Sequence, residues 1–273
     1  VSAFHTKISA AVINLSEIES HFSNKDKPAA IISIDDGHYD ILENIFPILS
    51  ELGMSFNVNI DTEILETGKP QDFVRVYDIL NQSQITSYIN SKYLDKPIVI
   101  DRINPMNTEN EFTLLLSNLT TEEKREVTDD LSVKAGIGNI HFSKMLSEKD
   151  VKFLSQHNVE FGSHSHTHSI LTNINVEQIE HELRHSKQIL EKITQKKVEV
   201  LAYPNGIHNE ITDKIAKEIG YTILLETDDQ INQIQPQNKS INSYKRVNQY
   251  HQTVEEALAH TYGITKIIKK LRG

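Results

Sequence analysis

The stretch AAIISIDDG, residues 29–37, is an apolar, strand-like run that ends in two adjacent carboxylates and a glycine. Successive side chains of a strand point to opposite faces of a sheet, so Asp35 and Asp36 can serve one site only if the chain turns there. Gly37 permits such a turn. One of the two aspartates could then bind a metal ion, while the other stays free to accept a proton.

Strand-like runs of the same kind recur along the chain, and periodic segments with apolar residues at helical spacing lie between them. The runs are residues 29–34, 55–58, 159–163, 198–203, 221–226 and, more weakly, 244–247. Asn175 and Gln178 form a candidate capping box for one helix, and a last helix is expected over residues 253–271. This alternation predicts an α/β fold with a parallel sheet, either closed as a barrel or doubly wound.

Residues 61–135 break this rhythm, because they are polar, contain Pro70, Pro97 and Pro105, and do not extend the alternation. We therefore expect one domain over residues 1–273 with an insertion at about residues 61–135. The insertion could pack over the core as a lid or a partner surface, or be a partly mobile surface excursion.

Composition limits the classes of function. The chain has 273 residues, 38% hydrophobic residues and a net charge of −10, which argues against a nucleic-acid partner. No apolar run approaches the roughly 20 residues of a membrane span. The absence of cysteine excludes disulfides and thiolate metal sites. No charged-then-apolar leader follows Val1, so we expect either that none exists or that one has been removed.

A second stretch, GSHSHTH at residues 162–168, directly follows another strand-like run. His164 and His168 are four residues apart, so on a helical turn both imidazoles would fall on one side and could grip one ion. With a carboxylate from residues 35–36 they make three ligands that hold a catalytic divalent metal and leave positions open. Both stretches lie at the C-terminal ends of predicted strands, where barrel active sites collect. The sequence therefore predicts a metal-dependent hydrolase.

These motifs resemble those of the polysaccharide deacetylase family, also called carbohydrate esterase family four or the NodB homology domain. SIDDG at residues 33–37 matches the family's T-F-D-D-G, and HSHTH at residues 164–168 matches H-S/T-x-x-H. AYPNG at residues 202–206 is similar to A-Y-P-Y-G, the third motif. The resemblance covers roughly residues 28–60 and 140–250, and it implies a distorted, TIM-like (β/α) barrel of about seven strands.

Carried over residue by residue, the resemblance implies that Asp36, His164 and His168 bind one divalent metal. Zn²⁺ is expected first, with Co²⁺, Ni²⁺, Fe²⁺ or Mn²⁺ as alternatives. Asp35 would then be the catalytic base. These roles agree with metal-assisted hydrolysis, in which a free carboxylate beside the metal takes a proton.

The third motif is implied to contact substrate through Tyr203, Pro204 and Asn205, with the backbone N–H of Asn205 helping to hold an oxyanion. Many family members carry an arginine in this motif that orients the base, but Ala202 stands at that position here. Arg246 could supply the missing guanidinium from a later strand, or it could be an ordinary surface residue.

Other departures concern the leaving group. The fourth family motif contains a tryptophan, and this chain has none. The fifth family motif supplies a histidine that protonates the leaving amine, and no clean L-x-H segment is found here. We interpret His251 and His260 as surface residues. His166 could face the cleft, whereas His181 and His185 read as a solvated helix face. The general acid is left unassigned.

The leading hypothesis is removal of N-acetyl groups from an amino-sugar polysaccharide or glycan, with release of acetate. One alternative is O-acetyl ester hydrolysis, or cleavage of another small amide, at the same metal site. An alternative from another class is a degenerate barrel that binds glycan without turnover. The family's polymeric substrates imply an extracytoplasmic location and an acetylated polysaccharide or oligosaccharide as partner. No nucleic acid or membrane span is expected, and no oligomeric state is predicted.

Overall fold

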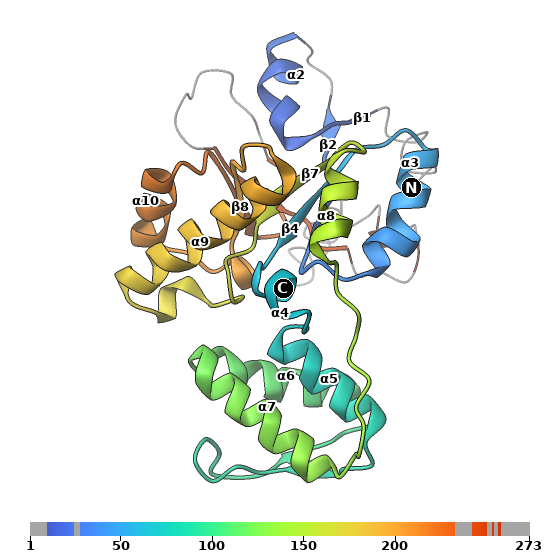
Figure 1. Cartoon of the computed structure of the whole chain (residues 1–273), viewed down its shortest axis with the longest axis vertical. Coiled ribbons are helices and arrows are strands. Elements are labelled where there is room, and N and C mark those ends of the chain that lie inside the picture. Colours follow the sequence, from blue (N-terminus) through green and yellow to red (C-terminus); the bar gives the residue numbers. More distant parts are fainter. Residues whose placement is uncertain (1–9, 25–27, 233–241, 250–252, 254–255, 258–273) are drawn as a thin grey trace, which may run out of the picture.

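The structure, a computed structural model, describes residues 10–24, 28–232, 242–249, 253 and 256–257 (Figure 1). Its strands are β1 (Ala11–Val12), β2 (Ala29–Ala30), β3 (Ser33–Asp35), β4 (Phe56–Ile60), β5 (Ser87–Tyr88), β6 (Ile98–Val99), β7 (Val159–Ser163), β8 (Val200–Ala202), β9 (Ile223–Thr227) and β10 (Asn242–Arg246). Its α-helices are α2 (Ile18–Asn24), α3 (Phe46–Glu51), α4 (Glu63–Thr67), α5 (Asp72–Gln82), α6 (Pro105–Ser117), α7 (Thr121–Ala135), α8 (Glu148–Ser155), α9 (Val176–Thr194) and α10 (Glu210–Ile219). Most of the helix predicted for residues 253–271, together with His251 and His260, lies outside the described residues.

Six strands form one parallel sheet in the order β10-β9-β8-β7-β4-β3. The sheet curls into a half-barrel, which confirms the predicted α/β barrel-like class with six strands in the described part, where about seven were predicted. The first predicted run divides in two, because Ala29 pairs with Ala11 outside this sheet while Asp35 pairs with Asn59 inside it. The remaining predicted runs become β4, β7, β8, β9 and β10.

Apolar side chains cover both faces of this sheet. Along β8, Leu201 belongs to a core shared with helices α3, α8, α9 and α10, as expected for a parallel sheet. Val200 and Ala202 point the other way and pack with Leu15 and Ile18 of the N-terminal segment. The predicted capping box begins α9, and no helix in the described part of the chain has both the length and the apolar character of a membrane span.

The segment between β4 and α8 contributes no strand to the main sheet. Helices α5, α6 and α7 and the antiparallel β5–β6 pair enclose a core of their own around Val76, Phe112 and Leu131, and Figure 1 shows them below the sheet. The chain returns to the main body where the Leu146 N–H donates to the Gly37 carbonyl at 2.8 Å. That residues 1–273 form one catalytic domain with an insertion at about 61–135 stays our proposal.

Parallel strands place their C-terminal ends at one edge of the sheet, where active sites of this architecture lie. Strand β3 ends at Asp35, β7 ends one residue before His164, and β10 ends at Arg246. Residues more than two hundred positions apart in the chain therefore meet at this edge.

Close packing next to this edge gives a stability prediction at Gly162 in β7. A Cβ atom there would overlap Asn59 Oδ1 and lie 2.9 Å from Val200 Cγ1. We expect Gly162→Ala to lower the free energy of unfolding by about 1–3 kcal/mol through overpacking. Gly138→Ala is the matched control, because nothing lies within 4 Å of its added Cβ. Urea denaturation compares the two, and equal stabilities would contradict the tight contact.

Candidate metal centre

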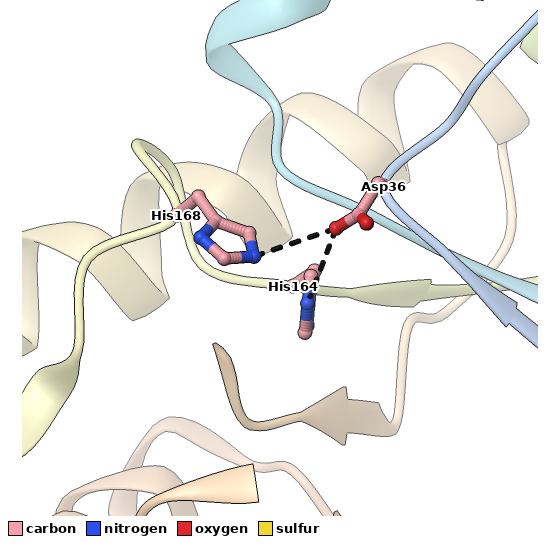
Figure 2. Close-up of side chains that lie close together, drawn as sticks. All are labelled: Asp36, His164 and His168. Carbon is pink, nitrogen blue, oxygen red and sulfur yellow. Dashed lines mark ion pairs between the residues drawn. The ribbon is translucent and has the colours of Figure 1, made fainter. Parts of the chain in front are cut away.

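Figure 2 shows Asp36, His164 and His168, the three predicted ligands, turned toward one another. Asp36 Oδ1 lies 3.5 Å from His164 Nε2 and 3.4 Å from His168 Nε2. One donor atom from each residue lies within 4.8 Å of the other two, so the group could hold one metal ion. The arrangement joins the end of β3 to the loop after β7.

Left-handed backbone conformations aim these side chains. Asp36 and Gly37 both have positive φ, 73° and 72°, so the chain turns sharply as it leaves β3. Gly37 is needed for a second reason, because a Cβ there would lie 2.8 Å from Ile64 Cδ1. Non-glycine residues in this region carry strain of about 1–3 kcal/mol and cluster at functional sites.

The two histidines are not on a helical turn, which corrects that expectation. Residues 164–170 form an irregular loop in which Ser165 and His168 have φ of 67° and 55°. These two turns bring the His164 and His168 ring centroids to 4.9 Å. The four-residue spacing therefore brings the two rings together through turns of the loop backbone and not through a helix.

The donor set fits a divalent cation. The buried Oδ1 of Asp36 has no hydrogen-bond partner, although it faces two imidazole nitrogens. Burial lowers the pKa of His164, which favours its neutral form. His164 Nδ1 lies 2.8 Å from the Ala202 carbonyl, so the N–H donates there and the Nε2 lone pair faces Asp36. Tetrahedral Zn²⁺ with bonds of about 2.0–2.1 Å separates its donors by about 3.4 Å, close to the distances found.

Asp35 also lies near His164, with Oδ2 3.9 Å from Nε2, but its hydrogen-bond partners differ from those of Asp36. Arg246 Nη1 and Nη2 donate to its two carboxylate oxygens at 2.7 Å each, and Asn59 Nδ2 donates at 2.8 Å. Burial alone would raise the pKa of Asp35, but the positive charge of Arg246 and the hydrogen bonds from Arg246 and Asn59 hold that pKa well below its usual range. Asp35 is therefore ionised and fixed in orientation. The roles of Asp35 as base and Arg246 as its orienter stay predictions.

The third predicted motif follows β8. Tyr203 and Pro204 are buried, and the Tyr203 hydroxyl donates to Asp213 at 2.8 Å. Asn205 is exposed with a φ of 55°. The side chain of Tyr203 thus braces α10, and the contact expected between the Asn205 backbone and substrate stays a prediction.

Several supporting residues were not identified from the sequence. Glu182 of α9 is buried and accepts from the N–H groups of His166 and Thr167, both at 2.8 Å, which clamps the histidine loop. Gln71 Nε2 donates to the Asp36 carbonyl at 2.9 Å, and Phe73 packs against His168 with ring centroids 5.0 Å apart. The start of the inserted segment therefore helps to build the centre.

Comparison with known proteins is consistent with this geometry. A family model described as polysaccharide deacetylase matches residues 64–224, which include His164 and His168 but begin after Asp35 and Asp36. YxkH of Bacillus subtilis (strain 168), a curated protein assigned to the polysaccharide deacetylases, is 29% identical over 92 residues. That match covers 34% of this chain and 32% of YxkH, so it spans about a third of that relative.

Solved structures resemble most of this chain in fold. The deacetylase PplD of Streptococcus pyogenes, in complex with acetate, is 18% identical with a TM-score of 0.57, covering 91% of this chain and 78% of that chain. The polysaccharide deacetylase BC0361 of Bacillus cereus is 17% identical with a TM-score of 0.59, covering 95% and 58%. At these identities the likeness establishes the fold.

Removal of either imidazole should remove one bound metal ion. We expect His164→Ala and His168→Ala to bind one equivalent of Zn²⁺ fewer than the wild-type chain, because two donors cannot retain the ion. His141→Ala is the control, since its side chain is exposed and distant in sequence from the site. Equilibrium dialysis of chelator-stripped protein followed by elemental analysis gives the counts. Wild-type metal content in both site variants would contradict the ligand assignment.

Proposed function

The chain belongs to the polysaccharide deacetylase family, and we propose that it is a metal-dependent hydrolase that removes N-acetyl groups from an amino-sugar polysaccharide or glycan. The observation that carries the proposal is that two adjacent carboxylates have different partners. Asp36 faces two imidazoles with an unsatisfied oxygen, while Asp35 is held by a guanidinium. A metal site beside a free, oriented carboxylate is what amide hydrolysis by water requires.

The proposed chemistry divides between the two carboxylates. Asp36, His164 and His168 would hold the divalent metal, which when bound supplies Lewis-acid polarisation of the acyl carbonyl. Asp35 would accept a proton from the attacking water, whose oxygen bonds to the acyl carbon. The carbon–nitrogen bond then breaks as its nitrogen takes up a proton, which balances the one that Asp35 removed from water, and the products are acetate and a free amine. Because Asp35 is ionised and fixed by Arg246, it is ready to accept that proton without reorientation.

The loop after β8 would complete the site. The backbone N–H of Asn205 is proposed to donate to the oxyanion that forms on the acyl oxygen. Its left-handed backbone, at a φ of 55°, supports a specialised position for this residue. Tyr203 and Pro204, which are buried, would hold the loop in place.

Substrate class and location follow the same proposal. An acetylated polysaccharide or oligosaccharide is the proposed partner, and an extracytoplasmic site of action is proposed from the polymeric nature of such substrates. Zn²⁺ is the proposed native metal, since two imidazoles and a carboxylate suit it. A glycan-binding barrel without turnover is disfavoured, because it would have no use for the oriented carboxylate at Asp35.

An acetate-release assay tests the function. Purified protein is incubated with chitin oligomers, poly-N-acetylglucosamine, peptidoglycan and O-acetylated xylan, with chelator, without chelator, and after Zn²⁺ is restored. Release from an N-acetylated polymer that chelator abolishes and Zn²⁺ restores would support the proposal. Release from xylan alone would assign an O-acetyl esterase, and no release from any polymer would favour the binding barrel.

Asp35→Asn separates turnover from metal binding. We expect kcat to fall by about 10²–10⁴-fold, because an amide cannot accept the proton, while metal content stays at the wild-type level. Asp40→Asn, an exposed neighbour, is the control. Near-normal acetate release by Asp35→Asn would remove its assignment as the base.

Arg246 should act by positioning Asp35. We expect Arg246→Ala to lower kcat by about 10–100-fold with little change in KM or metal content, because a displaced base costs rate without costing binding. Arg246→Lys should recover only part of the loss, since lysine cannot form the two-point contact. Lys245→Ala, whose side chain pairs with Asp228 at 2.6 Å, is the control. Equal kcat values for all four proteins would show that the pairing is structural only.

A further inference from the structure

A second group of histidines and a carboxylate lies on the other side of the histidine loop. Glu66 of α4, His166 of the loop and His185 of α9 bring one donor atom each to within 4.8 Å of one another. None of them belongs to the Asp36 centre. We propose that these three residues form a second divalent-cation site, suited to Zn²⁺ or another first-row transition metal.

The distances match a shared cation better than direct pairing. His166 Nε2 lies 3.7 Å from Glu66 Oε2, and His185 Nε2 lies 3.6 Å from Glu66 Oε1. Both separations exceed the 2.7–3.2 Å range of an N–H···O hydrogen bond. They are close to the roughly 3.4 Å that separates two donors of a tetrahedral Zn²⁺.

The ring of His166 is already oriented for coordination. Its Nδ1 lies 2.9 Å from the Thr62 hydroxyl, which fixes the ring and leaves Nε2 on the Glu66 side. Its backbone is held from two directions, because its N–H donates to Glu182 and its carbonyl accepts from the Glu63 N–H at 2.9 Å. Such outer contacts commonly align and strengthen a metal ligand.

The two imidazoles converge from different elements. The rings of His166 and His185 meet edge to face, with centroids 4.5 Å apart at 82°. His181, one turn earlier on α9, stacks against His185 with centroids 5.2 Å apart, and it is exposed. Three protein ligands with His181 or water as a fourth would complete a tetrahedral set. The helix face that carries His181 and His185 was predicted to be solvated, and under this proposal it binds a metal ion instead.

A cation at this position would have a definite effect on the fold. It would tie α4, where the inserted segment begins, to α9 through the loop that carries His164 and His168. Because it binds the folded chain only, it would raise the free energy of unfolding by an amount that grows with the logarithm of the free Zn²⁺ concentration above the dissociation constant. This inference does not depend on deacetylation, since its readouts are metal content and stability.

Metal counting on the full chain tests the second site. Chelator-stripped protein is dialysed against Zn²⁺ and then metal-free buffer, and retained zinc is measured. We expect two equivalents for the wild type, one each for Glu66→Gln and His185→Gln, one for His164→Ala, and none for His164→Ala combined with His185→Gln. Glu177→Gln on the same helix and His157→Gln are matched controls and should keep two.

The same variants give a second readout in thermal unfolding. Saturating Zn²⁺ should raise the Tm of Glu66→Gln and His185→Gln less than it raises that of the wild type. Circular dichroism checks that both variants fold, which their partly exposed positions favour. Retention of one equivalent by the wild type and none by His164→Ala, or of two by both Glu66→Gln and His185→Gln, would overturn the second site. Neither result would bear on the deacetylase proposal, which depends on the other centre.

Discussion

The ion pair between Asp35 and Arg246 joins the two edge strands of the sheet, and the site depends on that closure. Strands β3 and β10 stand at opposite ends of the strand order. Neighbouring strands are about 4.8 Å apart, so the edges of a flat sheet of this size would be about 24 Å apart, beyond the reach of these side chains. The 2.7 Å contacts therefore require the sheet to curl until its edges face each other. The curl of the half-barrel and the orientation of the Asp35 carboxylate therefore depend on each other.

The turn at Asp36 gives the two adjacent aspartates different partners. Asp35 stays in the strand and faces Arg246 and Asn59, whereas the left-handed backbone of Asp36 sends its side chain toward the imidazoles. Asp36 Oδ1 accepts no hydrogen bond, so it is available to a cation. If Asp35 also lacked donors, two buried charges would repel each other without compensation. Because Asp35 has hydrogen-bond donors and Asp36 faces imidazoles, both neighbouring carboxylates can remain ionised.

Local sequence signals were enough for the strands of the main sheet, but not for helices α5, α6 and α7 of the inserted segment or for the contacts between elements. The run at residues 159–163 and the capping box of α9 follow from short-range patterns, and both were predicted within a residue or two. Asn59 and Glu182 were missed, because their importance lies in partners more than 15 residues away in the sequence. An amide among the apolar side chains of β4 was the available signal for Asn59. The spacing of His164 and His168 predicted two rings that do lie together, but on the wrong backbone, because a helical turn and a loop with two positive φ angles can both bring residues i and i+4 together.

The side chains of the histidine loop point alternately to its two sides, which explains why one short motif faces two clusters. Residues 164 and 168 turn toward Asp36, while residue 166 turns toward Glu66 and α9. Glu182 holds the backbone between them, so a displacement of His166 would be passed to its neighbours. The two clusters therefore share one loop, whose backbone Glu182 of α9 holds in place.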